Sequence, residues 1–158
     1  MKIAVNTRLL IRNKIDGIGR FTFETMNRIS KDHPEHQFYF FFDRAYDESF
    51  IFSNNIHAIV LQPPARHPIL YLIWYEWSVR RALKKINADL FVSCDGMISL
   101  LSKVPALSVI HDLSFEHRPQ DIPLLYRSYY KIMMPRFAAM AKKIATVSNF
   151  SKQDIIEK

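Results

Sequence analysis

The chain has 158 residues, of which 49% are hydrophobic, and this length and composition are typical of one folded domain rather than of a disordered segment. Its single cysteine, Cys94, excludes an intramolecular disulfide and a cysteine-rich zinc site. The net charge of +7 favours acidic partners such as phosphate-bearing ligands or anionic lipid, but no nucleic-acid-binding motif accompanies it, and we expect no nucleic acid partner.

Apolar runs alternate with helix-length segments from the N-terminus onwards. A strand is predicted at residues 3–5, directly after Met1 and Lys2, so no signal peptide is visible and we expect a cytoplasmic protein. A helix is predicted at residues 17–30, a second and strongly aromatic strand at 37–42, and a short helical turn at 47–52. A third strand at 56–61 precedes a long helix at 69–86.

The second half of the chain continues the alternation. Strands are predicted at residues 89–93 and 106–110, and a helix follows at 123–141, in which we expect Pro135 to cause a kink or a break. A sixth strand at 143–147 leads to Ser148, which should cap a last helix beginning near Phe150. Strands separated by helices predict a single α/β domain over residues 1–158, with a doubly wound, mainly parallel sheet and helices on both faces. The last helix reaches Lys158 without a Gly or Pro to end it, and we therefore expect a chain trimmed from a larger protein.

Cys94 stands at the end of the apolar run that forms the fourth predicted strand. A buried and inert thiol is the main interpretation of this position, and a catalytic nucleophile is the alternative.

The helix predicted at 69–86 has two different faces. Trp74 and Trp77 lie on one side, which continues into Arg81 and Lys84. Tryptophans beside cations are typical of a helix at a membrane interface, which suggests peripheral membrane association or an acceptor-binding face. The alternative is that the tryptophans pack against another element or a partner subunit.

Glu76 falls on the opposite side of this helix, where it should find a partner or point into a cleft. That side is the expected core stripe, formed by Ile69, Leu72, Val79, Leu83 and Ile86.

A pair of glycines, Gly17 and Gly19, opens the helix predicted at 17–30, and Arg20 follows it. Glycines let backbone amides approach a ligand, and a helix N-terminus attracts phosphate. Thr22 stands where a dinucleotide-binding fingerprint has its third glycine, so that fingerprint is excluded. Two interpretations remain open, namely contact with a phosphate group and a helix start that needs a flexible backbone.

The strand predicted at 106–110 stops abruptly at His111 and Asp112. Ligands of open α/β sheets bind just past the carboxyl ends of such strands, so we expect His111 at the edge of a ligand crevice. There His111 would donate a hydrogen bond to a phosphate or a sugar hydroxyl while Asp112 orients the loop; the alternative is a polar cap of the strand–loop junction. With His117 the pair also suggests metal ligands, but the spacing matches no zinc pattern and we predict no metal site.

Four segments together resemble the N-terminal half of a GT-B glycosyltransferase of the group 1 type, which is family 4 of the retaining enzymes. These segments are GIGRF at 17–21, SCDG at 93–96, HDLSFEHRP at 111–119 and TVSNFSKQDI at 146–155, and the last two are the most specific. The resemblance implies a Rossmann-like domain that shapes the acceptor side of a cleft. It also implies that the nucleotide sugar is held mainly by a C-terminal domain that this chain does not contain, and that no further cofactor is needed.

The resemblance assigns roles to individual residues. His111 corresponds to the histidine near the transferred sugar and diphosphate, which makes it the catalytic candidate. Gly17 and Gly19 correspond to the loop near the donor diphosphate. The complete set of substrate-binding candidates is Gly17, Gly19, Arg20, Asp95, Gly96, Asp112, Ser148, Ser151 and Lys152.

We therefore expect the acceptor-side half of an enzyme that transfers a hexose, for example mannose, with retention to a glycan or lipid-linked acceptor in cell-surface polysaccharide synthesis. The family's donor motif and diphosphate contacts lie in the C-terminal domain, so the isolated chain should be inactive and its cleft-facing apolar surface suggests self-association. Two alternatives remain. The first is a free-standing Rossmann-like binding or interaction domain without catalysis, and the second is a two-domain sugar epimerase, which would not predict the segment HDLSFEHRP.

Overall fold

The computed structural model describes residues 1–158 and contains one six-stranded sheet in which every strand pair is parallel. The strand order is β3-β2-β1-β4-β5-β6, so the direction of winding reverses between β1 and β4. This order confirms the predicted Rossmann-like, doubly wound sheet. The strands are β1 (Lys2–Asn6), β2 (Gln37–Phe42), β3 (Ile56–Val60), β4 (Leu90–Ser93), β5 (Ala106–Val109) and β6 (Lys143–Ala145).

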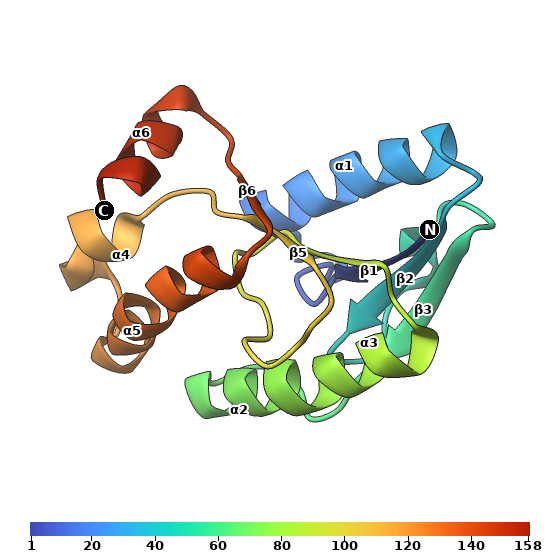
Figure 1. Cartoon of the computed structure of the whole chain (residues 1–158), viewed down its shortest axis with the longest axis horizontal. Helices are drawn as coiled ribbons and strands as arrows, with labels where there is room; N and C mark the ends of the chain where they lie inside the picture. Colours follow the sequence, from blue (N-terminus) through green and yellow to red (C-terminus); the bar gives the residue numbers. More distant parts are fainter.

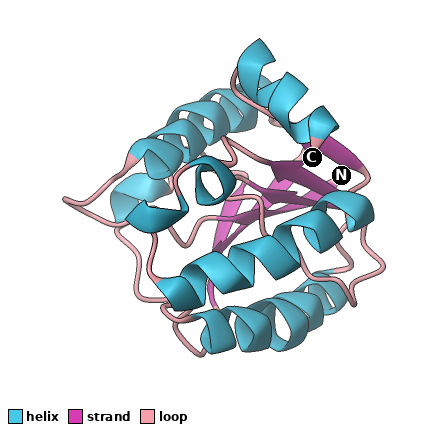
Figure 2. Ribbon diagram, turned by 90° about the vertical axis from the view of Figure 1, so that its left-hand side faces the viewer, coloured by secondary structure: helices cyan, strands magenta, loops and turns pink.

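Helices cover both faces of this sheet, and Figure 1 shows α1 (Gly17–Asp32) on the opposite side of the strands from the run formed by α2 and α3. That run is continuous and consists of α2 (Pro68–Ile73), the π-helical segment η2 (Trp74–Val79) and α3 (Arg80–Ile86). Figure 2 shows the strands enclosed between the helices. The remaining helical segments are η1 (Glu48–Phe50), α4 (Ser114–His117), η3 (Pro119–Asp121), α5 (Leu124–Met140) and α6 (Asn149–Glu157).

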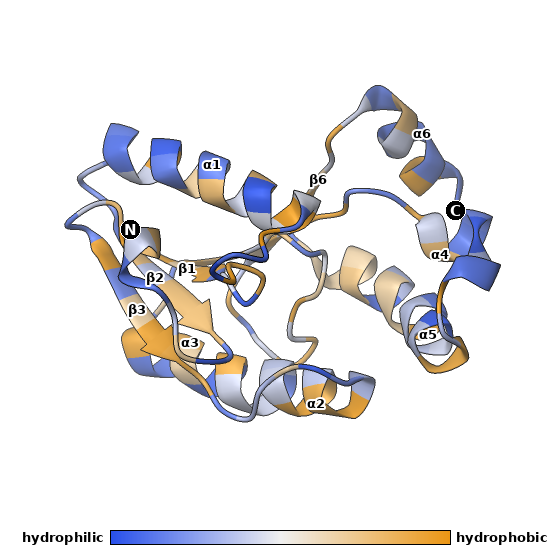
Figure 3. Cartoon of the chain, turned by 180° about the vertical axis from the view of Figure 1, so that it is seen from behind, coloured by the Kyte–Doolittle hydropathy of each residue, from blue (hydrophilic) through white to orange (hydrophobic).

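The aromatic strand β2 contributes side chains to both hydrophobic cores of the domain. Phe38, Phe40 and Phe42 belong to the core under α1, together with Met26 of that helix. Phe41 points the other way, into the core under the α2–α3 run and α5. Successive side chains of a strand alternate between the faces, and a parallel strand covered on both faces needs apolar residues on both. Figure 3 accordingly shows β2 as a hydrophobic strand.

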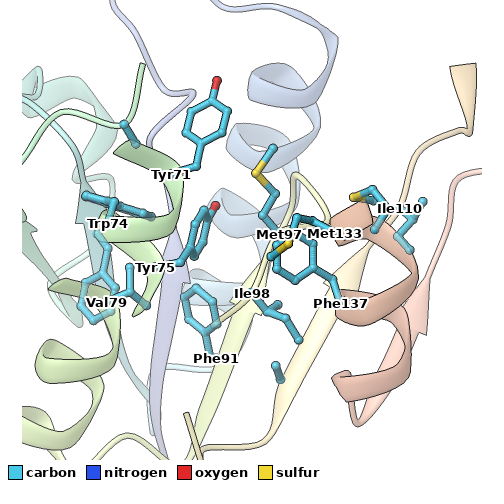
Figure 4. Packing of buried hydrophobic residues seen from close by; sticks show 14 of the residues in the cluster. Tyr71, Trp74, Tyr75, Val79, Phe91, Met97, Ile98, Ile110, Met133 and Phe137 are labelled. Atoms are coloured by element: carbon cyan, nitrogen blue, oxygen red, sulfur yellow. The ribbon is translucent and has the colours of Figure 1, made fainter. Parts of the chain in front are cut away.

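The predicted core stripe of the long helix was wrong in part. Val79 and Leu83 are buried as expected, but Ile69 is 61% exposed. Trp74 is fully buried, which agrees with the alternative that it packs against another element and not with a place on the surface. Figure 4 shows Trp74 among the buried side chains of the cluster, and its indole Nε1 donates to the carbonyl oxygen of Leu61 at 3.1 Å.

The π-helical segment explains this difference. Tyr71, Tyr75, Val79 and Leu83 are buried at a spacing of four residues, which is longer than the 3.6 residues of an α-helical turn. A π-helical turn contains more residues than an α-helical turn. Residues four positions apart therefore stay on the core side of the helix through η2. A stripe assigned at α-helical spacing necessarily drifts from the observed one.

Pro135 does not break α5, which runs without interruption from Leu124 to Met140. Proline removes the hydrogen bond to the carbonyl group four residues earlier, here that of Lys131. Both Pro135 and Lys131 are exposed, so solvent can hydrate that carbonyl. The other element boundaries agree with the prediction to within a few residues, except that α4 and η3 were not predicted. No helix in the structure combines the length and the apolar character needed to cross a membrane.

Candidate functional site

A pocket of about 610 Å³ opens at the carboxyl ends of β1, β4 and β5. The strand order reverses there, which is where ligands of doubly wound sheets bind. Loops after the three strands contribute Arg8, Asp95 and His111, and the helices α2 and α5 contribute Tyr71 and Tyr126. The structure thus brings His111 to the edge of a crevice, as predicted.

An ion pair lies against this pocket. Nε of Arg8 donates to Oδ2 of Asp95 at 2.6 Å, and both side chains are almost entirely buried. The Arg8 guanidinium also lies 4.8 Å from the centre of the Tyr71 ring, an arrangement typical of a cation–π contact. Burying one of these charges without the other would be strongly unfavourable. The pair therefore couples the loop after β1 to the loop after β4.

Asp95 was predicted to bind substrate, but its carboxylate is surrounded by donors of the chain itself. The Tyr75 hydroxyl, the Ser93 hydroxyl and the Met97 amide donate to it at 2.9–3.2 Å. Burial alone would raise the pKa of Asp95, but the charge of Arg8 and these hydrogen bonds outweigh burial and lower the pKa below its usual value. Asp95 is therefore charged and acts on the pocket by holding Arg8.

His111 is fixed by contacts on two sides. Its Nε2 atom lies 2.8 Å from the carbonyl oxygen of Cys94, and its ring meets the ring of Phe21 edge-on at 5.0 Å. A carbonyl oxygen only accepts hydrogen bonds, so Nε2 carries the proton of the neutral ring and Nδ1 is left as an acceptor. Nδ1 makes no hydrogen bond within the chain. In the neutral ring Nδ1 is free to accept a hydrogen bond from a ligand, whereas the sequence suggested that His111 would act as a donor.

Asp112 and Asp16 also line the pocket, each with one oxygen engaged. Oδ1 of Asp112 accepts from the Ser114 amide at 2.8 Å, which orients the start of α4 as predicted for this residue. Oδ1 of Asp16 accepts from the Gly19 amide at 2.7 Å and caps α1. The second oxygen of each carboxylate makes no hydrogen bond within the chain. Two carboxylate oxygens and Nδ1 of His111 are thus free acceptors.

The structure separates the roles of Gly17 and Gly19. A Cβ atom at Gly19 would lie 2.7 Å from the carbonyl oxygen of Leu9, whereas a Cβ at Gly17 would meet nothing within 4 Å. Gly19 is therefore required because the chain packs closely on itself there, a structural reason that differs from the flexible backbone considered from the sequence. Gly17 stands at the open end of α1, where the neighbouring Asp16 carboxylate already occupies the positive end of the helix dipole. Arg20 lies outside the pocket and pairs with Glu24 at 3.1 Å.

Gly96 is buried below the pocket and has a φ of +83°, a conformation that side chains rarely adopt. Its carbonyl oxygen accepts from the Ser108 hydroxyl at 2.8 Å, which ties the loop after β4 to β5. Gly96 therefore shapes the loop that carries Asp95.

Ser148, Ser151 and Lys152 lie apart from this pocket, at the start of α6. Oγ of Ser148 accepts from the Ser151 amide at 3.0 Å, which confirms the predicted cap. Lys152 is exposed beside a separate hollow next to β6. His117, considered above as a metal ligand, bonds to Asp154 at 2.7 Å and connects α4 to α6.

Sequence reasoning missed Arg8 and the tyrosines of the pocket. Arg8 follows β1 by two residues, so its position at the end of a strand was a usable signal. Tyr71 and Tyr126 come from helices whose inward faces depend on packing. Cys94 is buried as predicted, and burial raises the pKa of its thiol to about 11, which argues against a nucleophile.

Residues 15–158 match the model of Glycosyltransferase Family 4. No curated protein matches the chain. The family match covers the glycine pair, the His111 loop and the Ser148 segment, and the strand order is that of a Rossmann-like GT-B half. The chain belongs to glycosyltransferase family 4 and carries its N-terminal GT-B domain.

Proposed function

We propose that the domain is the acceptor-side half of a retaining enzyme that transfers a hexose, with mannose as the first candidate, from a nucleotide sugar to a glycan or lipid-linked acceptor in cell-surface polysaccharide synthesis. The nucleotide-sugar domain would lie on a further part of the protein, and the 158-residue chain alone would be inactive.

The observation that carries this proposal is the set of free acceptor atoms in the pocket: one oxygen each of Asp16 and Asp112, and Nδ1 of His111. Sugar hydroxyls donate hydrogen bonds, and three fixed acceptors can hold several of them. Asp95 compensates the charge of Arg8, so the two other carboxylates leave the pocket wall negative. A neutral, polyhydroxylated group fits this wall better than a phosphate does.

The walls of the pocket are aromatic and also fit a sugar. Tyr71, Tyr126 and Tyr130 line it. Burial raises the pKa of Tyr130 to about 12, so its phenol stays protonated at neutral pH. Tyr126 donates to the carbonyl oxygen of Arg66 at 3.1 Å, which holds the ring in place. Ring faces with fixed positions supply apolar contact to a pyranose while its hydroxyls bond to the carboxylates.

Sugar transfer by a longer protein that includes the nucleotide-sugar domain tests the proposal. A panel of nucleotide sugars would be supplied with glycan and lipid-linked acceptors, and NMR of the anomeric proton would give the configuration of the product. Retention with a hexose donor is expected, together with no transfer by residues 1–158 alone. Transfer by residues 1–158 alone would contradict the assignment of donor binding to another domain, and inversion would contradict the mechanism.

A further inference from the structure

The outward face of the α2–α3 run carries exposed apolar side chains that are continuous with a group of cations. The four-residue spacing that buries Tyr71, Tyr75 and Val79 also aligns the opposite side, where Ile69, Ile73 and Trp77 follow one another. Trp77 is 67% exposed. Figure 3 shows hydrophobic residues along α2. We call Ile69, Leu72, Ile73 and Trp77 the exposed stripe, and Arg80, Arg81 and Lys84 the basic cluster.

Glu76 is the one acidic residue between residues 66 and 88, and its carboxylate is hydrogen-bonded within the chain. Its carboxylate accepts from the amides of Leu100 and Leu101 at 2.7 and 3.0 Å and from the Ser99 hydroxyl at 2.7 Å. These bonds also place the exposed Leu101 beside the helix. The face therefore presents apolar groups and three cations, and its one carboxylate is already hydrogen-bonded to donors within the chain.

No member of the basic cluster forms an ion pair, whereas Arg20 and Arg28 on α1 both pair with Glu24. Arg80, Arg81 and Lys84 surround a shallow hollow beside Trp77. A bilayer presents anionic headgroups above an apolar layer, and tryptophan prefers the boundary between the two. The arrangement of charge and apolar surface on this helix is complementary to that boundary.

We propose that this face docks on an anionic lipid bilayer, with the exposed stripe at the headgroup–acyl boundary and the basic cluster on the lipid phosphates. Trp74 has no part in it, because it is buried, and this corrects the surface suggested by the sequence. Tyr71 of the same helix lines the pocket, so docking would keep the pocket close to the lipid surface. The link to a lipid-linked acceptor rests on the proposed function, whereas docking itself does not.

Sedimentation with vesicles of phosphatidylcholine, with and without phosphatidylglycerol, tests docking without any sugar donor. We expect binding to the anionic vesicles alone. Trp77→Ala should weaken it about tenfold, and Arg81→Gln with Lys84→Gln about fivefold per cation. The matched controls are Phe150→Ala, which removes another exposed aromatic ring, and Arg28→Gln with Lys31→Gln, which removes two exposed cations of α1.

Tryptophan fluorescence supplies a second readout. Trp74 is already buried, so a blue shift on adding vesicles should come from Trp77 and disappear in Trp77→Phe. If the α1 control pair lost as much binding as the Arg81/Lys84 pair, the net charge of the chain alone would explain binding, and the proposal would be overturned. Unchanged binding in the Trp77 and Arg81/Lys84 variants would overturn it as well. A concentration-dependent dimer that Trp77→Ala abolishes would identify a second copy as the partner of this face instead.

Discussion

Arg8 and Asp95 are 87 positions apart in the sequence and form a 2.6 Å ion pair against the pocket, with side chains that are 8% and 4% exposed. The pair connects the ends of β1 and β4, the two strands between which the winding reverses. Because the Tyr75 and Ser93 hydroxyls complete the shell of Asp95, the carboxylate is held in place and in turn positions the guanidinium. The geometry of the pocket depends on this pair.

Asp95→Asn should lower the free energy of unfolding by about 3–5 kcal/mol, because it leaves the Arg8 charge buried without a counter-ion. Urea denaturation at neutral pH measures this loss. Glu24→Gln is the matched control, since it removes a carboxylate from exposed ion pairs and should change stability by at most about 1 kcal/mol. A loss below about 1 kcal/mol for Asp95→Asn would show that solvent reaches the Arg8 charge.

The same carboxylate predicts a pH dependence with a definite sign. Arg8 and the hydrogen bonds lower the pKa of Asp95 in the folded state, against the effect of burial, so the pair stabilises fully above the unfolded pKa of about 3.9. That contribution is lost as pH falls through the lower, folded pKa. The stability difference between wild type and Asp95→Asn should therefore be constant near neutral pH and shrink in acid. A difference that grows on acidification would contradict a lowered pKa.

Gly19→Ala and Gly17→Ala should have opposite effects on stability. A methyl group at residue 19 meets the Leu9 carbonyl at 2.7 Å and should destabilise the fold by about 1–3 kcal/mol. At residue 17 it meets nothing, so alanine should be neutral or stabilise by up to about 1 kcal/mol through the unfolded state. Thermal unfolding of the two variants measures the contrast. Equal destabilisation would mean that helix geometry, rather than contact with Leu9, requires both glycines.

Cys94 should resist thiol reagents in the native state. Burial raises its pKa to about 11, and its side chain is almost inaccessible, so little thiolate exists at pH 8. Because it is the chain's single cysteine, the labelled fraction directly reports its accessibility. We expect labelling with a chromogenic disulfide to be complete in urea and slow without it. Rapid labelling of the native protein would contradict the buried thiol and support the alternative that Cys94 is a nucleophile.

The sequence was sufficient for the doubly wound sheet, because each strand is a short apolar run with helical spacing on either side. The Ser148 cap and the position of His111 also followed from local patterns. The inward face of the long helix could not be predicted from local patterns, because the wider turn of η2 rotates Trp74 into the core. Arg8 was missed since its partner, Asp95, lies far away in the sequence. Pairings of this kind arise from the sheet order and not from local spacing.

The fixed ring of His111 presents a free acceptor atom, Nδ1, to the pocket, so His111→Ala tests the account most directly. In a longer protein that contains the donor-binding domain, we expect sugar turnover to fall by about 100-fold or more. The free energy of unfolding should change by less than about 1.5 kcal/mol, since the bond to Cys94 is a single hydrogen bond. Turnover and unfolding free energy, measured on the same preparation, decide the matter. A large loss of stability with turnover preserved in the remaining folded protein would contradict the account and make His111 a cap of the strand–loop junction.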